Sequence, residues 1–376
     1  MSDQTGILLH VAEDLIGRPR DELPTPALVL DVDTMRDNIA TMAAWNRDHV
    51  AVRPHFKTHK CIEIAREQIS AGAIGITCAT VWEARALVNA GLDEILIANE
   101  VVGPAKLSVL GELAQEARIT VAVDDADNAT ALAEMARSGG AELGAIVEID
   151  VGLHRGGVRS AVQAVRLARH VATLSGLRLR GVMGYEGHVV TEPDPLVRRR
   201  RAALAMDELV GFVDALRDDG HTVEIVSAGG TNTYDMTGAD PRITELQAGT
   251  YVVMDGAYAP LAPAFRPALT IMATVVSRQG ATAVLDCGTK CLAVDAALPT
   301  PPIGSVREVH EEHTLLDVGD GEPPAIGDVL ELTVGYCGGT INLHDVYFVA
   351  SGEEIVDIWG IRGRGPGWTS ELRRRS

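Results

Sequence analysis

A dense basic cluster is the first candidate for chemistry in this chain. Residues 53–60 contain two lysines, two histidines and one arginine. They follow the apolar pair Ala51-Val52 and precede a run with helical spacing, so they are predicted to lie where a strand gives way to a helix. A lysine that is partly desolvated and crowded by cations has a lowered pKa, and its free amine can form a Schiff base with a carbonyl. Lys57 is therefore a candidate catalytic residue, and a solvated basic loop is the alternative.

Two turns of small residues are candidates to hold a phosphate group. Backbone N–H groups can surround a phosphate where no bulky side chain intervenes, and hydroxyls can help. The alternative is a tight turn that needs glycine only for its backbone conformation. The first turn contains Ser227, Gly229, Gly230 and Thr231, and the second contains Gly249, Thr250 and Tyr251.

Three further polar side chains follow apolar runs. Arg155 lies among glycines, where it can reach into a site, although a surface arginine is the simpler interpretation. Tyr185 can stack on a ring or bond to it, and His188 can move protons near neutral pH, although a single histidine in such a place is more often structural.

The elements that must position these residues form a repeating pattern. Apolar runs alternate with stretches of helical spacing. This alternation predicts a (β/α)₈ barrel of TIM type, with a doubly wound open sheet as the alternative. The carboxyl ends of barrel strands share one rim, which gathers Lys57, His59, Arg155, Tyr185 and His188. The eight runs are 51–56, 74–79, 94–99, 118–124, 143–150, 179–185, 223–227 and 243–249.

The remaining sequence predicts a second, all-β domain. After Pro267 the apolar runs are short and alternate with polar residues, and turn signals separate them. Residues 25–31 form an early strand that is expected to pair with this region. We therefore expect a barrel over 33–260 and a β domain formed by 1–32 plus 261–376.

Composition narrows the class of protein. The chain has 376 residues, 46 % of them hydrophobic, and a net charge of −19, which disfavours non-specific binding to nucleic acid or to anionic membranes. No apolar run reaches the roughly 20 residues of a membrane span, and the first residues do not resemble a signal peptide. Five widely spaced cysteines without a CxxC motif predict reduced thiols in a cytoplasmic protein.

Taken together, these motifs resemble the fold-type III pyridoxal 5'-phosphate (PLP) enzymes, specifically the D-threonine aldolase / D-serine dehydratase-like family with its alanine racemase-like barrel. The resemblance runs from residue 24 to residue 365, and residues 53–60 are its most specific element. It implies that Lys57 carries the cofactor, that Arg155 and Tyr185 contact it, and that the two small-residue turns hold its phosphate. It also implies a homodimer.

The sequence departs from this family at one place. Members usually bind a divalent metal through His-x-Asp or His-x-Cys, just before a stretch similar to residues 340–343. Here the preceding residues are Tyr336, Cys337 and Gly338. A neutral phenol and a glycine cannot supply that site. Cys337, shifted by one residue, would face the other way on a strand. We therefore expect no metal at the usual family site, and a different site using His313 or His344 stays open.

Three functions follow from the resemblance. The first is a lyase that cleaves a β-hydroxy D-amino acid into glycine and an aldehyde, with His188, His59 or Tyr336 accepting the hydroxyl proton; dehydration is a near variant. The second is a racemase or epimerase that uses Lys57 and Tyr336 on opposite faces of the substrate. The third is a PLP-binding protein without turnover, which the separate β domain disfavours.

Overall fold

The computed structural model describes residues 14–367. The chain divides into two compact units. The barrel unit comprises Met42–Lys57 and Ile64–Gly249, and the β unit comprises Met1–Thr41, Thr58–Glu63 and Thr250–Ser376. The predicted β domain also includes residues 1–13 and 368–376, which lie outside the described residues. The predicted domain limits at 33 and 260 stay predictions.

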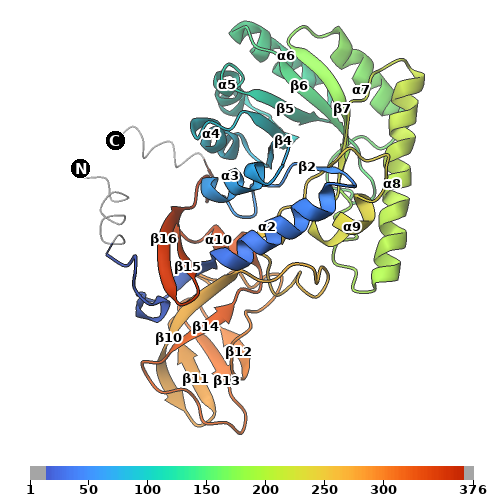
Figure 1. The fold of residues 1–376 in the computed structure, drawn as a ribbon. Coiled ribbons are helices and arrows are strands. Elements are labelled where there is room, and N and C mark those ends of the chain that lie inside the picture. The colour runs from blue at the N-terminus through green and yellow to red at the C-terminus, as the bar shows by residue number, and fades with distance from the viewer. Residues whose placement is uncertain (1–13, 368–376) are drawn as a thin grey trace. The chain divides into compact units, whose positions relative to one another are not determined.

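The barrel unit is built on a parallel sheet of eight strands in the order β2-β9-β8-β7-β6-β5-β4-β3. Strands β4 to β7 of this sheet are labelled in Figure 1. Every predicted run overlaps one of these strands, which confirms the barrel. The strands are β2 (Ala51–Val52), β3 (Ile76–Cys78), β4 (Glu94–Glu100), β5 (Arg118–Val123), β6 (Leu143–Glu148), β7 (Leu177–Gly184), β8 (Ile225–Ala228) and β9 (Glu245–Leu246).

Backbone hydrogen bonds close this sheet into a ring. The N–H of Ile74 donates to the carbonyl of Val52 (2.9 Å), and the N–H of Thr77 donates to that of Pro54 (2.9 Å). The N–H of Phe56 donates in turn to the carbonyl of Thr77 (2.7 Å). These bonds join the two ends of the strand order, so the carboxyl ends of all eight strands share one rim.

The segments between the strands form helices because the sequences of these segments combine capping residues with one apolar face. In α7, for example, Ser160 caps the first turn, and Ala164, Leu167, Ala168 and Val171 form the buried face. The helices are α2 (Val32–Asn46), α3 (Ile62–Ser70), α4 (Val81–Asn89), α5 (Pro104–Leu113), α6 (Ala126–Gly139), α7 (Ala161–Thr173), α8 (Pro195–Asp218) and α9 (Tyr234–Thr237). The short α9 and the turn η2 (Thr231–Thr233) lie in the stretch 230–242 between β8 and β9.

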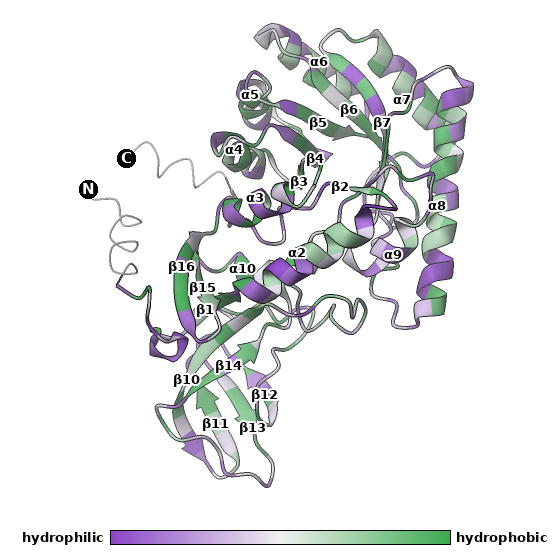
Figure 2. Cartoon of the chain, in the orientation of Figure 1, coloured by the Kyte–Doolittle hydropathy of each residue, from purple (hydrophilic) through white to green (hydrophobic). Residues whose placement is uncertain are grey.

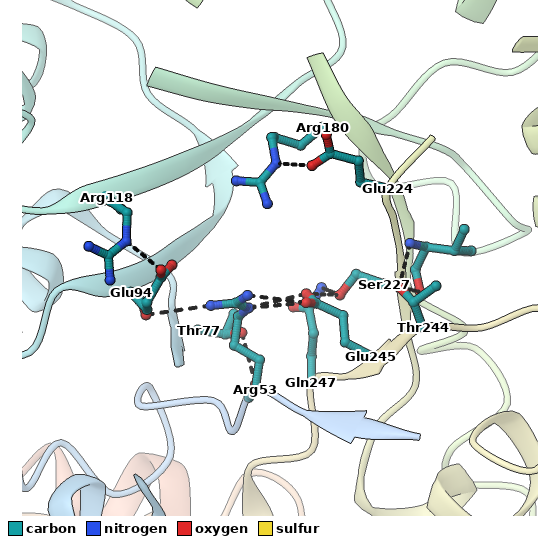
Figure 3. A network of polar contacts seen from close by, with 11 residues as sticks. Arg53, Thr77, Glu94, Arg118, Arg180, Glu224, Ser227, Thr244, Glu245 and Gln247 are labelled. Atoms are coloured by element: carbon teal, nitrogen blue, oxygen red, sulfur yellow. Dashed lines mark hydrogen bonds and ion pairs between the residues drawn. The ribbon is translucent and has the colours of Figure 1, made fainter. Parts of the chain in front are cut away.

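The barrel interior combines an apolar cluster with one polar network. Leu96, Ala122, Ile146, Met183 and Ile225, from five successive strands, form the cluster, and Figure 2 shows that hydrophobic residues predominate along these strands. In the polar network, Arg53 donates to the buried carboxylate of Glu245 at 3.2 Å, and Ser227 donates to the same carboxylate at 2.9 Å (Figure 3). Removing one partner of a buried ion pair costs about 3–5 kcal/mol, so Arg53 is fixed as a structural residue.

The β unit contains a mixed sheet in the order β12-β13-β11-β10-β1-β15-β16, with β14 paired to β10. Strand β1 lies antiparallel to β10 and parallel to β15, which confirms the pairing predicted for residues 25–31. The strands are β1 (Ala27–Asp31), β10 (Leu269–Gln279), β11 (Thr282–Leu285), β12 (Ser305–Val309), β13 (Thr314–Asp317), β14 (Val329–Thr333), β15 (Val346–Ser351) and β16 (Glu354–Gly360).

Two features of the β unit differ from the sequence analysis. Strands β12 and β13 were not predicted, since β12 is largely exposed and its sequence lacks the apolar alternation of a half-buried strand. The expectation that Cys337 lies on a strand is wrong, because Cys337–Ile341 form the short helix α10. Glycines at 338 and 339 weaken any strand preference there. No helix in the described range 14–367 has the length and apolarity needed to cross a membrane.

Candidate active site

Lys57 lies at the rim of the barrel, directly after the backbone that closes the ring. The N–H of His55 donates to the carbonyl of Ala248 (3.1 Å), so the chain before Lys57 is held from the β9 side as well as from β3. Lys57 is exposed as a residue, but protein surrounds its ammonium group. Desolvation by burial, and then the positive charge of Arg155, lower the pKa of Lys57, while the charge of Glu83 opposes them. The amine is thus reachable and more readily uncharged than an ordinary lysine.

Tyr185 and Arg155 lie beside this amine. The Nζ atom of Lys57 lies 5.9 Å from the centre of the Tyr185 ring, and the guanidinium carbon of Arg155 lies 6.0 Å from the same centre. Arg155 also lies 3.6 Å from the carboxylate of Glu148 at the end of β6. The structure therefore brings together three of the predicted site residues, which come from the ends of β2, β6 and β7.

The turn after β8 provides a cradle that only glycine can form. Gly229 has φ +81°, and a Cβ atom there would lie 2.4 Å from Leu246 Cδ2. A Cβ atom at Gly230 would lie 3.3 Å from Cε2 of Tyr185. The backbone of the turn therefore lies directly against the tyrosine ring that faces Lys57. A flat aromatic cofactor with a phosphate fits a lysine, a tyrosine and an open turn arranged in this way.

Three of the predicted phosphate donors already have acceptors within the protein. The hydroxyl of Ser227 donates to Glu245 in the barrel interior, and the N–H of Gly229 donates to Oε2 of Glu186 at 3.2 Å. The N–H of Gly230 donates to the Thr233 hydroxyl at 3.2 Å. Ser227, Gly229 and Gly230 thus shape the turn through internal hydrogen bonds. Gly230 and Thr231 are buried, and their role in phosphate binding stays a prediction.

The residues of the second predicted phosphate turn make packing contacts and a backbone hydrogen bond within the protein. Tyr251 is 2 % exposed, and its ring centre lies 5.5 Å from that of Phe265. The carbonyl of Thr250 accepts the N–H of Met254 at 2.7 Å, within the turn that begins with η3 (Thr250–Val252). Gly249 is the last residue of the barrel unit. A phosphate-binding role for these three residues stays a prediction.

His188 lies in the loop after β7 and packs against the loop after β6. A Cβ atom at Gly152 would lie 3.0 Å from its Cε1 atom. Its Nδ1 atom is buried, with no hydrogen-bond partner in the described range. Burial, and then the charge of Arg201, lower the pKa of His188, so its ring favours the neutral form that can accept a proton.

Asp150 anchors the loop that supports His188. Burial alone would raise its pKa, but hydrogen bonds from the backbone and ring of His154 and from the N–H of Gly152 lower the pKa of Asp150 to about 2. The ring of His154 lies 2.9 Å from the Asp150 carboxylate, and Arg159 lies 3.1 Å from it. Asp150 therefore remains a carboxylate under all ordinary conditions and holds the β6 loop in place.

His59 occupies a structural position. It is fully buried, its Nδ1 accepts the N–H of Cys61 at 3.2 Å, and its carbonyl accepts the hydroxyl of Tyr347. These contacts belong to the β unit. They fix the backbone after the cluster of residues 53–60, so a catalytic role for His59 gains no support.

The residues at the usual metal position of the family do not match the ligand pattern of that site. A Cβ atom at Gly338 would lie 3.6 Å from the hydroxyl oxygen of Tyr336, so the phenol fills the space beside a residue that has no donor. Cys337 is buried, and its N–H donates to Asp255 at 3.0 Å. Burial, and then the charge of Asp255, raise the pKa of the Cys337 thiol well above its usual range. A thiol that keeps its proton is a poor metal ligand.

The alternative ligands His313 and His344 lie in different surroundings. His344 Nε2 lies 2.9 Å from the carbonyl of Cys291, and burial lowers the pKa of His344. His313 lies in the exposed turn between β12 and β13. No group of three histidine, cysteine, aspartate or glutamate side chains suited to a metal ion occurs within residues 14–367.

The sequence analysis did not identify two carboxylates at the rim, Glu148 and Glu186, because both are buried in the folded protein. Burial, and then a hydrogen bond with Glu100, raise the pKa of Glu148 to about 8. Glu186, with no exposed surface, accepts hydrogen bonds from the turn after β8. The signal available for Glu186 was its place between Tyr185 and Gly187, because a carboxylate at a strand end among glycines has backbone donors nearby.

Comparison with known proteins places this geometry in a family. Residues 30–256 match the alanine racemase, N-terminal domain family, and residues 268–350 match the putative serine dehydratase domain family. The chain is 38 % identical to a D-threonine aldolase of Arthrobacter sp, over 93 % of this chain and 95 % of the relative. It is 33 % identical to a 3-hydroxy-D-aspartate aldolase of Paracoccus denitrificans (strain Pd 1222), over 94 % and 95 % of the two chains.

A solved structure gives the same result. The crystal structure of D-threonine aldolase from Filomicrobium marinum superimposes with a TM-score of 0.91 at 37 % identity, over 93 % of this chain and 98 % of that one. The matches span both units, and they include the strands and loops that carry Lys57, Arg155 and Tyr185. This chain belongs to the D-threonine aldolase-like family of fold-type III PLP enzymes.

Proposed function

We propose that this protein is a PLP-dependent lyase that cleaves a β-hydroxy D-amino acid into glycine and an aldehyde. The observation that carries the proposal is the desolvated amine of Lys57 facing the Tyr185 ring, which in turn lies against the glycine turn after β8. The similarity to a D-threonine aldolase and to a 3-hydroxy-D-aspartate aldolase supports this reaction and this substrate class.

The residues that would hold the cofactor come from four strand ends. Lys57 would form the Schiff base through Nζ, and its lowered pKa favours the free amine that this bond requires. Tyr185 and Arg155 would contact the ring, and the turn around Gly230 and Thr231 would receive the phosphate. When bound, PLP supplies the electron sink that accepts the electron pair of the broken bond at Cα.

Two side chains of the protein, those of His188 and Lys57, would carry out the proton transfers. We assign the β-hydroxyl proton to the ring of His188, because this ring favours the neutral form that can accept a proton. Lys57 Nζ would return a proton to Cα after the Cα–Cβ bond has broken, which leaves glycine. A base within hydrogen-bond reach contributes about 10²–10⁴-fold in rate.

Tyr336 is suited to a different role. Burial, and then the charge of Cys337, raise the pKa of Tyr336, so its phenol favours the protonated form and is poorly suited to removing a proton. The proposal includes no metal at the family position, because the residues there supply no pair of ligands. The homodimer and the cytoplasmic location stay predictions.

Product analysis tests the proposal. Purified protein reconstituted with PLP should release equimolar glycine and aldehyde from D-threonine or D-phenylserine, and the Lys57→Ala variant should release neither. An oxo-acid and ammonia as products would instead indicate dehydration. Loss of optical purity with deuterium exchange at Cα and no cleavage would indicate a racemase. A visible cofactor band without turnover of any amino acid would indicate a binding protein.

A further inference from the structure

A single buried carboxylate ties together two loops of the candidate site. Glu186 has no exposed surface and lies in the loop after β7. Its Oε2 accepts the N–H of Gly229 at 3.2 Å, and its Oε1 accepts the hydroxyls of Thr233 and Thr237 at 2.7 and 2.6 Å. All three donors belong to the segment between β8 and β9, so Glu186 holds that segment from across the rim.

Tyr185 and Glu186 contact two consecutive glycines of the turn. The ring of Tyr185 lies against Gly230, where an added Cβ atom would lie 3.3 Å from Cε2. The carboxylate of Glu186 bonds to the N–H of Gly229. One residue of this dipeptide thus faces the Lys57 side of the turn, and the next fixes the turn from its buried side.

The chemistry of these contacts shows why a carboxylate is present. Burying a charge is unfavourable unless hydrogen bonds compensate it, and every hydrogen bond described for Glu186 comes from a neutral group. Short bonds from hydroxyls to a carboxylate are charge-assisted and stronger than neutral ones. An apolar side chain would fill the same space without fixing the direction of the Gly229 N–H. Such a group is suited to setting the geometry of a backbone turn.

We propose that Glu186 is a positioning residue that holds the Gly229–Thr233 turn in the shape required to receive the phosphate of the cofactor. This inference rests on the proposed function, since it takes the turn to be the phosphate site. Glu186 acts through shape and not through charge, because a negative charge near a phosphate opposes binding. Its loss should therefore weaken recognition of the phosphate specifically.

The test compares two ligands that differ only in the phosphate. Dissociation constants for PLP and for pyridoxal are measured with apoenzyme by absorbance or fluorescence titration. Glu186→Ala should weaken PLP binding by about 10–100-fold and change pyridoxal binding by less than about 3-fold, because the turn loses the hydrogen bonds that set its shape and pyridoxal has no phosphate to place there. Glu186→Gln retains one acceptor, so it should restore part of the difference.

Two further variants keep the test decisive if Glu186→Ala does not fold. Thr237→Val removes one donor to Glu186 without changing the size of the side chain, and it should lower the PLP-to-pyridoxal preference by about 3–10-fold. Asp125→Ala is the matched control, because it removes two backbone hydrogen bonds at the start of α6 and should lower thermal stability without altering the preference.

The outcomes separate this inference from the proposed function. Equal weakening of both ligands in the Glu186 and Thr237 variants would overturn the positioning role and leave Glu186 as a structural residue. Failure of the wild-type protein to bind either ligand would instead overturn the proposed function. A preference for PLP that drops in these variants and persists in Asp125→Ala supports the assignment.

Discussion

The Nζ atom of Lys57 lies 5.9 Å from the centre of the Tyr185 ring, although Lys57 follows β2 and Tyr185 follows β7, which are not neighbours in the sheet. Arg155 approaches the same ring, so two cations share one aromatic neighbour. This arrangement keeps the amine close to a flat surface and close to a positive charge. Burial and the positive charge of Arg155 lower the pKa of Lys57, which favours a neutral amine.

The first prediction concerns the ionisation of Lys57. Burial, and then Arg155, lower the pKa of Lys57, so its amine should react at lower pH than an ordinary lysine. Arg155→Ala removes the second cause, which raises the pKa and moves the midpoint of reaction to higher pH. Arg155→Lys keeps the charge and should shift the midpoint less. The measurement is the pH dependence of labelling of apoenzyme by an amine-directed reagent, followed at the Lys57 peptide.

The control for this titration is Arg169→Ala, which removes an arginine on the exposed side of α7. The midpoint for Lys57 should not move in this variant. If the midpoint of the wild type equals that of exposed lysines in the same sample, the desolvated site described above is wrong.

The second prediction concerns the position of the Tyr185 ring. A Cβ atom at Gly187 would lie 2.6 Å from Cε1 of Tyr185, so Gly187→Ala must displace the ring from its place above the glycine turn. We expect PLP affinity to fall by about 10-fold, equivalent to about 1.4 kcal/mol, while the fold persists. Gly211→Ala is the matched control, since an added Cβ in the exposed face of α8 meets no atom within 4 Å. That variant should gain about 0.5–1 kcal/mol of stability and keep its PLP affinity. Unchanged affinity in Gly187→Ala would remove Tyr185 from the site.

The third prediction concerns the carboxyl group of Glu148. Burial, and then its interaction with Glu100, raise its pKa to about 8, whereas the unfolded chain has the ordinary glutamate value of about 4.3. Between these values the folded state binds the extra proton, so this group lowers the free energy of unfolding as pH rises, up to about pH 8. Glu148→Gln cannot ionise and should escape that loss.

The measurement is the difference in free energy of unfolding between Glu148→Gln and the wild type, from denaturant titrations. It should grow by on the order of 1–3 kcal/mol from about pH 5 to about pH 8 and then level off. Glu116→Gln, at an exposed position, is the control and should show a flat difference. A flat difference for Glu148→Gln as well would mean that Glu148 is ionised in the folded protein throughout this range.

The fourth prediction concerns metal ions. Because Tyr336 and Gly338 replace the ligand pair and Cys337 retains its proton, treatment with a chelator followed by desalting should change activity by less than about 2-fold. Metal analysis of the purified protein should find less than about one divalent ion per ten chains. Loss of activity on chelation, with recovery on adding a divalent cation, would contradict this prediction and point to a site formed by other residues.

The sequence predicted the barrel because the eight apolar runs and the helical spacing between them are local features, and each run overlaps a strand. It also predicted the pairing of residues 25–31 with the C-terminal region. Strand β12 was missed because its polar residues face solvent on both sides, so no apolar alternation marks it. Cys337 was expected on a strand, but two following glycines allow the helix α10 instead.

The sequence predicted those residues of the candidate site that directly follow the ends of strands. Lys57, Arg155 and Tyr185 were found from their positions after apolar runs, and the structure brings them together. The directions of hydrogen bonds were not predictable. The hydroxyl of Ser227 faces Glu245, and the N–H of Gly229 faces Glu186. Both acceptors are distant in sequence and become neighbours only when β8 pairs with β9 and β7.

The central claim is that the amine of Lys57 binds PLP covalently. Borohydride reduction of the PLP-loaded protein, followed by proteolysis and mass spectrometry, tests it most directly. We predict a single pyridoxyl label on the peptide that contains Lys57, and no label in Lys57→Ala. A label on Lys60, Lys106 or Lys290, or an undiminished label in Lys57→Ala, would contradict the account.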